Sequence, residues 1–300
     1  MTPTSKTRIH AFGRSCQLAV DPRRHDSDAL LAQAAAELRR IEGKFSSFDS
    51  DSVISRINQA AGTGVFTELD AESRGLLDFA TTLWSQSNHL FDPSTRLLQN
   101  CYAEDGRLRA SESQLQAMLG LVGWKHLEVN DAGAHLTKTG MVIDLNSIVC
   151  AYTADTIRKL LTKAGVESAW IDLDQDVATL GRQPDGANWL VGVRHPRGER
   201  TAITRLKVNS QGFARRGSFE RRIDMDGEPY GRGLSPIDGR PVPGLLSVIV
   251  IAESCLTACS AAAIARLKTE EAAKQWLEEL GMPWMAIDRK FRCCGPLAPR

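Results

Sequence analysis

The run Leu246–Ala252 constrains the fold of this chain more than any other segment. Two valines and two isoleucines follow one another within it, and such β-branched residues favour strands. A helix that spans a bilayer needs about 20 apolar residues, so a run of this length cannot cross a membrane. Two helical patterns follow it, Leu256–Leu267 and Glu270–Leu280. The segment therefore predicts a buried strand that is followed by two helices.

The rest of the chain mixes helix and strand patterns without strict alternation. One helix is marked by apolar residues at helical spacing from Leu30 to Ile41, with capping residues before it and Gly43 as a stop. Further helices are expected over 71–87, 113–122 and 154–164, and strands over 9–20, near 127, and over 142–145, 169–173, 189–193, 203–208, 221–225 and 284–287. This mixture indicates the α+β class. It is expected to form a single domain over 1–300, with loose ends at 1–7 and 291–300.

Composition and charge exclude several classes of protein. Hydrophobic residues make up 42% and charged residues 24% of the chain, which excludes long disordered or low-complexity regions. The formal charge is +1, from 37 basic and 36 acidic residues, and it predicts no nucleic-acid partner. Seven cysteines at irregular spacing argue against a disulfide framework, and the polar start lacks the apolar core of a signal peptide. Both features predict a cytoplasmic protein without membrane insertion.

No standard catalytic motif occurs, but two clusters of residues are able to carry chemistry. Cys255 and Cys259 share one helical face, where two thiolates suit a soft metal, although in an alanine-rich helix they are more often core residues. Arg215 and Arg216 precede a glycine, and Arg232 lies between two glycines. A guanidinium without bulky neighbours approaches a phosphate or carboxylate through two hydrogen bonds. The alternative for these arginines is a solvated turn.

Several segments taken together resemble the ApbE family, the FAD:protein FMN transferases. The similar segments, in family order, are Phe45–Asp49, Arg56–Asn58, Phe91–Ser94, Ile143–Leu145 with Tyr152 and Asp155, Trp189–Pro196, Gly239–Pro241 and Ser247–Ala252. The resemblance is collinear from Ile41 to Ile287. It implies a T-fold-like α+β domain with a mixed or antiparallel sheet flanked by helices. It also implies transfer of FMN from FAD to a threonine or serine of an acceptor protein, with Mg²⁺.

The resemblance also implies the positions of the site residues. It makes Asp144 a catalytic residue that also contacts the flavin nucleotide. The other residues that it places at the nucleotide are Phe48, Asp92, Ser94, Arg215, Arg216 and Gly217. Ser147 and Cys259 stand at the positions where the family holds its metal.

Departures from the family pattern gather at the catalytic and metal positions. The loop Gly-Gly-Ile-Ala-Lys-Gly becomes the segment 146–151, in which Cys150 replaces a charged residue and Ser147 still offers an oxygen. Arg232 replaces the family histidine, and the late Ala-Asp-x-x-x-Thr motif now contains Cys259 and Ala263. Magnesium prefers hard oxygen ligands. The usual Mg²⁺ site is therefore predicted to be lost, with arginines in place of the cation.

These departures leave different functions open. In the first alternative, the chain is an FMN transferase in ordinary or altered, metal-independent form, with Cys150 and Arg232 as catalytic candidates. Alternatively, it binds a flavin nucleotide or another anionic ligand through arginines without catalysis, or it has lost the pocket. Cys150 and Cys259 are expected to line one cleft. Their thiols either have a lowered pKa near the arginines, or they are buried and inert.

Overall fold

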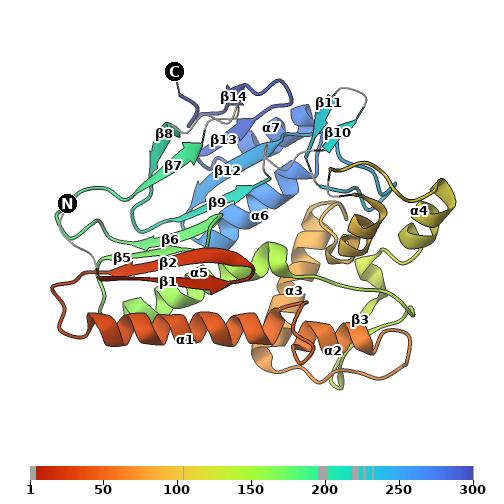
Figure 1. Ribbon diagram of the computed structural model, residues 1–300, viewed down its shortest axis with the longest axis horizontal. Helices are drawn as coiled ribbons and strands as arrows, with labels where there is room; N and C mark the ends of the chain where they lie inside the picture. The colour runs from red at the N-terminus through yellow and green to blue at the C-terminus, as the bar shows by residue number, and fades with distance from the viewer. Residues whose placement is uncertain are drawn as a thin grey trace.

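An eight-stranded antiparallel sheet forms the centre of the computed structural model, which describes residues 5–103, 105–194, 202–217, 223–225, 228–231 and 233–299 (Figure 1). Its strands, in spatial order, are β1 (Ser5–Ala11), β2 (Arg14–Val20), β5 (Ala169–Asp172), β6 (Asp176–Leu180), β9 (Gly212–Arg216), β12 (Ser247–Ala252), β13 (Trp284–Ile287) and β14 (Cys293–Cys294). Strands from both ends of the chain thus enter one sheet. The β-rich run becomes β12, which pairs with β9 and β13 and is buried at every position.

Three hairpins lie outside this sheet. They pair β3 (Leu127–Asn130) with β4 (Gly133–Leu136), β7 (Leu190–Arg194) with β8 (Ala202–Lys207), and β10 (Ile223–Met225) with β11 (Glu228–Tyr230). The β7–β8 hairpin packs Val193 and Leu206 against Phe213 and Ile249 of the large sheet. This hairpin therefore covers one face of the sheet with a separate small core.

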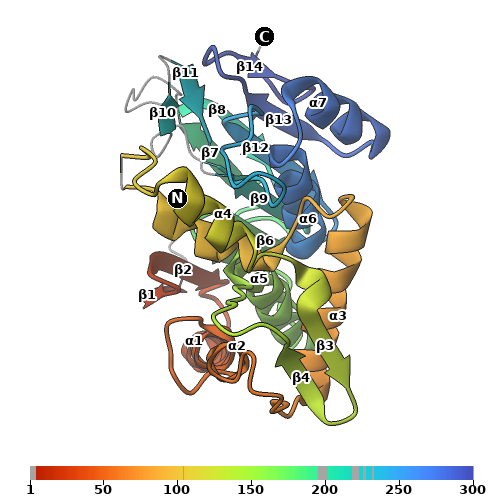
Figure 2. The same cartoon turned by 90° about the vertical axis from the view of Figure 1, so that its right-hand side faces the viewer.

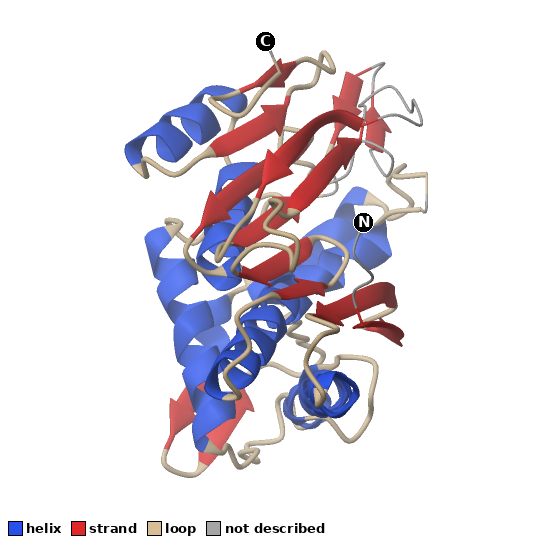
Figure 3. Cartoon of the chain, turned by 90° about the vertical axis from the view of Figure 1, so that its left-hand side faces the viewer, coloured by secondary structure: helices blue, strands red, loops and turns tan. Residues whose placement is uncertain are grey.

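Helices cover the other face of the sheet, as Figures 1 and 3 show. The helices of the described chain are α1 (Ser27–Phe45), α2 (Val53–Gln59), α3 (Ala71–Gln86), α4 (Glu112–Leu119), α5 (Asn146–Lys163), α6 (Cys255–Arg266) and α7 (Glu270–Glu279), with 3-10 turns η1 (Pro93–Cys101) and η2 (Trp124–His126). Helix α1 packs on β1 and β2, α5 on β5 and β6, and α6 on β9 and β12 (Figure 2).

Small residues bring α6 close to the sheet and to α5. Its buried face is mostly alanine and cysteine, which lets the backbones approach. Gly212 on β9 is part of this fit, because a Cβ there would lie 2.0 Å from the backbone nitrogen of Cys255. The start of α6 is thereby pressed against β9, the strand that ends in Arg216.

The α+β class is confirmed, as are most of the expected helices, but several boundaries were wrong. The expected strand over 9–20 is a hairpin, because Phe12 and Gly13 adopt positive φ angles of 53° and 70° and reverse the chain. The segment 142–145 is no strand, since its Ile143 pairs with the side chain of Asn58 instead. Helix α5 begins at Asn146, well before residue 154. Strands β6 and β9 were not expected, and both ends expected to be loose carry strands. No helix in the described part of the chain is long and apolar enough to cross a membrane.

Candidate functional site

Asp144 lies directly before α5 and connects three segments that are far apart in the sequence. Its carboxylate accepts a hydrogen bond of 2.6 Å from the backbone of Asn146 and one of 3.3 Å from the Ser47 hydroxyl. Arg96 Nε lies 3.3 Å from the same carboxylate, which is 11% exposed. The N-cap residue Leu145 offers no side-chain cap, but Asp144 and the carbonyl oxygen of Leu145 accept hydrogen bonds from the N–H groups of Asn146, Ile148 and Val149. This turn therefore offers an anion chiefly the positive end of the helix dipole. The structure therefore places a carboxylate and a guanidinium beside a helix N-terminus.

Phe48 forms the exposed edge of this group. Its side chain is 78% exposed, and the guanidinium carbon of Arg96 lies 5.7 Å from the centre of its ring. An exposed aromatic ring next to charged groups offers a surface on which a planar ring system can stack. Phe48, Arg96 and Asp144 are thus brought together, as the resemblance implied for Phe48 and Asp144.

Asp92 and Ser94 have a structural part in the same region. Both are buried, and Asp92 caps η1 by accepting hydrogen bonds from the backbone and the hydroxyl of Ser94. Asp92 also accepts from the backbone of Trp124, and Ser94 Oγ accepts from the backbone of Gly123. Because Asp144 N donates to Pro93 O, this turn positions Asp144.

Arg216 is the centre of a second, buried group. Its Nη2 lies 2.8 Å from a carboxylate oxygen of Asp176, 2.9 Å from the carbonyl oxygen of Ser147 and 2.7 Å from Cys259 Sγ. Cys259 Sγ also donates to the same Ser147 carbonyl, at 3.0 Å. The predicted metal positions Ser147 and Cys259 are therefore adjacent, and one guanidinium nitrogen contacts both.

Burial controls the charges of this group. Asp176 is 1% exposed, and burial raises its pKa although the charge of Arg216 acts in the opposite direction. Burial is the largest influence on Arg216 and lowers its pKa, but Asp176 and the neighbouring thiols together raise the pKa of the guanidinium above its ordinary value. The two side chains therefore form a buried ion pair at neutral pH.

The thiols beside Arg216 are buried and protonated. Burial raises the pKa of both Cys150 and Cys259 to about 12, and the attraction of Arg216 only partly offsets it. The charge of Arg216 acts on both thiols, but both side chains are buried, at 2% and 0% exposure, so the cleft expected between them stays a prediction. The structure favours the second of the two interpretations, in which these cysteines are unreactive at neutral pH.

Asp155 is an important residue of this region whose role the sequence did not reveal. Its carboxylate accepts hydrogen bonds of 3.0 and 2.8 Å from the backbone nitrogens of Cys255 and Leu256. Asp155 thus caps α6 from the neighbouring helix and fixes the position of Cys259 one turn later. Helical spacing alone gave no signal of this contact, because Asp155 lies about a hundred residues before Cys255 and Leu256 in the sequence.

The remaining predicted residues are separated. Arg215 and Arg216 are neighbours on β9, so their side chains leave opposite faces of the sheet. Gly217 has a φ of 88°, and a Cβ there would lie 2.3 Å from the carbonyl oxygen of Leu246. Arg232 lies outside the described residues. Its neighbours Gly231 and Gly233 pack against another arginine, Arg266 at the end of α6.

The residues around Ser147 do not fit a Mg²⁺ ion. They offer one carbonyl oxygen, a protonated thiol and a carboxylate that Arg216 already uses, whereas Mg²⁺ requires several hard oxygen ligands. Ala263, one turn after Cys259, adds only a methyl group. Within the described ranges, no three histidine, cysteine or acidic side chains gather in a way that could hold a metal.

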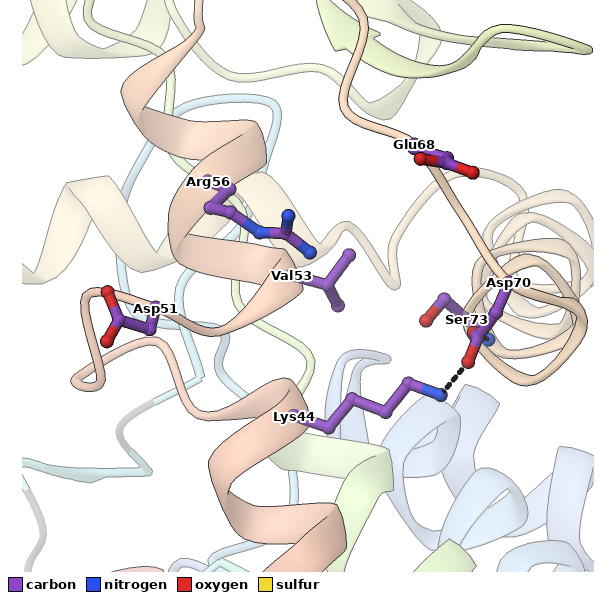
Figure 4. A pocket seen from close by; sticks show the side chains of 7 residues that line it. All are labelled: Lys44, Asp51, Val53, Arg56, Glu68, Asp70 and Ser73. Carbon is purple, nitrogen blue, oxygen red and sulfur yellow. Dashed lines mark hydrogen bonds and ion pairs between the residues drawn. The ribbon is translucent and has the colours of Figure 1, made fainter.

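A separate hollow of about 310 Å³ lies between α1, α2 and α3 (Figure 4). Its lining residues are Lys44, Asp51, Val53, Arg56, Glu68, Asp70 and Ser73. Lys44 already pairs with Asp70 and Glu72. None of the predicted site residues lines it, so it is not the candidate site.

Comparison with known proteins places these observations in a family. The chain matches the model of the ApbE family over residues 12–286. It is 21% identical over 239 residues to the FAD:protein FMN transferase of Vibrio cholerae, covering 78% of this chain and 71% of that protein. It is 33% identical over 132 residues to a FAD:protein FMN transferase of Klebsiella pneumoniae, covering 43% of this chain and 40% of that protein.

Solved structures show the same fold. The ApbE protein of Thermotoga maritima has a TM-score of 0.82 and 26% identity, over 98% of this chain and 97% of that one. The apo flavinyl transferase ApbE of Pseudomonas stutzeri has a TM-score of 0.83 and 23% identity, over 97% and 93% of the two chains. The second likeness is one of fold alone.

Proposed function

Because this chain belongs to the ApbE family, we propose that it binds FAD and transfers FMN to a hydroxyl group of an acceptor protein. The observation that carries the proposal is the group formed by Asp144, Arg96 and Phe48 at the start of α5. It combines a carboxylate, a fixed cation, the positive end of a helix dipole and an exposed ring. A flavin dinucleotide has matching parts, namely a planar ring system and a pyrophosphate.

In the proposed reaction, the acceptor hydroxyl oxygen attacks the phosphorus on the FMN side of the pyrophosphate. The bond from this phosphorus to the bridging oxygen breaks, and AMP leaves with that oxygen. The hydroxyl proton passes to a base, for which Asp144 is the candidate because the Ser47 hydroxyl and Arg96 hold its carboxylate in place. The misfit of the metal positions supports a reaction in which no resident Mg²⁺ takes part. Positioning and fixed charge then carry the catalysis.

Covalent labelling of an acceptor tests this function. The protein is co-expressed with a flavin-accepting domain, and in-gel flavin fluorescence is read after denaturing electrophoresis. We expect labelling with the wild type, and loss of labelling with Asp144→Asn while FAD still binds. FAD binding without any labelled acceptor would support the binding protein instead, and absence of FAD binding would refute both functions.

A further inference from the structure

We propose that Arg216 and Arg266 together take the electrostatic place of a divalent cation, so that the nucleotide's pyrophosphate binds without metal. This inference rests on the proposed function and names the groups that would hold its substrate.

The contacts of Arg216 are those of an ion at the centre of a coordination site. One nitrogen, Nη2, contacts a carbonyl of α5, a carboxylate of β6 and a sulfur of α6. Two of these partners, Ser147 and Cys259, stand where the family pattern places metal ligands. A guanidinium has a fixed positive charge and several donors. It can therefore donate hydrogen bonds to acceptors that would otherwise surround a bound cation.

The pair of Arg216 and Asp176 is neutral and attracts no anion by its net charge. Asp176 compensates the guanidinium at 2.8 Å, and the thiol of Cys259 contributes no charge. A second positive group is therefore needed near Arg216 if the site is to hold a pyrophosphate.

Arg266 supplies this second charge. It ends α6 and is half-buried beside the residue that follows Arg216, because a Cβ on Gly217 would lie 2.9 Å from Arg266 Cδ. Gly231 and Gly233 adjoin the same guanidinium, and a Cβ on Gly233 would lie 2.8 Å from its Nη2. Within the described residues no carboxylate pairs with it. Burial, and then the charge of Arg216, lower its pKa to about 10, so it stays charged at neutral pH.

The resulting net charge equals that of a metal site. Two guanidinium groups balanced by the single carboxylate of Asp176 leave one positive charge. A divalent cation balanced by one carboxylate leaves the same charge. The glycines around Arg266 have a physical role, since any side chain at Gly217 or Gly233 would displace the guanidinium. Arg266 thus has the two properties of an anion-binding group, an uncompensated charge and parallel donors.

Metal-free binding is the direct test. Calorimetry with FAD and with inorganic pyrophosphate is run in EDTA and then in millimolar Mg²⁺. We expect both ligands to bind in EDTA, with affinities that change less than about twofold on adding Mg²⁺. Binding only in the presence of Mg²⁺ would overturn this inference and leave the proposed function intact. Failure of both ligands to bind under either condition would refute the inference and the proposed function together.

Arginine variants test which positive charge holds the pyrophosphate. Arg266→Met is expected to weaken FAD and pyrophosphate binding by about tenfold or more, without lowering the melting temperature, because Arg266 has no ion pair to lose in the part of the chain that the structure describes. Arg39→Met, on the exposed side of α1, removes the same charge and should leave both affinities unchanged. The double variant Arg216→Met with Asp176→Asn leaves no buried charge unpaired, which keeps the fold testable. Unchanged affinity in Arg266→Met would overturn the inference.

A metal site rebuilt in the same place gives a readout independent of FAD. The variant Arg216→Met, Cys259→Asp, Ala263→Thr removes the guanidinium and adds two oxygen ligands on one face of α6. We expect Mg²⁺ to raise the melting temperature of this variant but not that of the wild type. A Mg²⁺-dependent rise in the wild type would show that Arg216 has not replaced the metal.

Discussion

Replacing Arg216 by methionine leaves the carboxylate of Asp176 buried without its partner. Asp176 is 1% exposed, and its other side-chain contact is a thiol, Cys255 Sγ, at 3.9 Å. Removing one partner of a buried ion pair costs about 3–5 kcal/mol. Replacing both partners by neutral groups costs far less, because no charge then remains to be solvated. We therefore expect Arg216→Met to lower the free energy of unfolding by about 3–5 kcal/mol at pH 8. Arg216→Met with Asp176→Asn should lower it by about 1 kcal/mol.

The stability loss of Arg216→Met should depend on pH, and the direction of this dependence follows from the pKa of Asp176. Without Arg216, the strongest influence that lowers the pKa of Asp176 is gone, while burial and the charge of Asp174 still raise it against a weaker effect of Arg14, so its folded-state pKa lies still further above the ordinary value of 3.8. A raised carboxyl pKa means that the folded state takes up a proton while the unfolded state does not. The deficit of Arg216→Met is therefore largest at pH 8 and shrinks as the pH falls toward 5, by at most about 1.4 kcal/mol per pH unit. The double variant has no such carboxyl and should show no such recovery.

Urea unfolding at pH 8 and pH 5, followed by circular dichroism, measures these differences. The wild type, both single variants and the double variant form a cycle, in which the two single losses together are expected to exceed the double-variant loss by at least about 2 kcal/mol. A loss below about 1 kcal/mol in Arg216→Met, or a loss that does not change with pH, would show that the pair is not a buried ion pair. It would then refute the role assigned to Arg216.

Three further substitutions test other parts of the region. Burial raises the pKa of Asp172 to about 6, so its charge destabilises the fold above that pH. Asp172→Asn should therefore have a higher melting temperature than the wild type at pH 8, and this difference should vanish near pH 4. Asp155→Ala removes the acceptor of two N–H groups of α6 and should cost about 2 kcal/mol in urea unfolding. A neutral result would show that the Ser254 cap, which accepts from the backbone of Thr257, is sufficient to hold the start of α6. Gly212→Ala places a Cβ 2.0 Å from the backbone of Cys255 and should cost about 3 kcal/mol or more, and wild-type stability would mean that α6 moves away freely.

Local patterns in the sequence were sufficient for most helices and for β12. In α1 and α3 the signal is the helical spacing of apolar residues, and in β12 it is the β-branched run. Each signal lies within a single short segment of the sequence. Such patterns depend only on which face of an element is buried, so they need no knowledge of its partner. The short strands β6 and β9 were not predicted, because their burial comes from neighbours in the sheet. Neither strand shows a regular alternation of exposed and buried residues.

The sequence by itself determined the family and the α+β class, and it predicted which of the family's catalytic and metal positions are replaced. It placed Arg216, Ser147 and Cys259 among the altered positions without relating them to one another. Only the tertiary structure decided that one nitrogen of Arg216 contacts the other two, that Asp176 compensates its charge, and that Arg266 stands beside it with no carboxylate partner among the described residues. The physical reason is that charge and pKa depend on distance and burial. Those quantities arise when β6, β9, α5 and α6 pack together, and no local pattern encodes them.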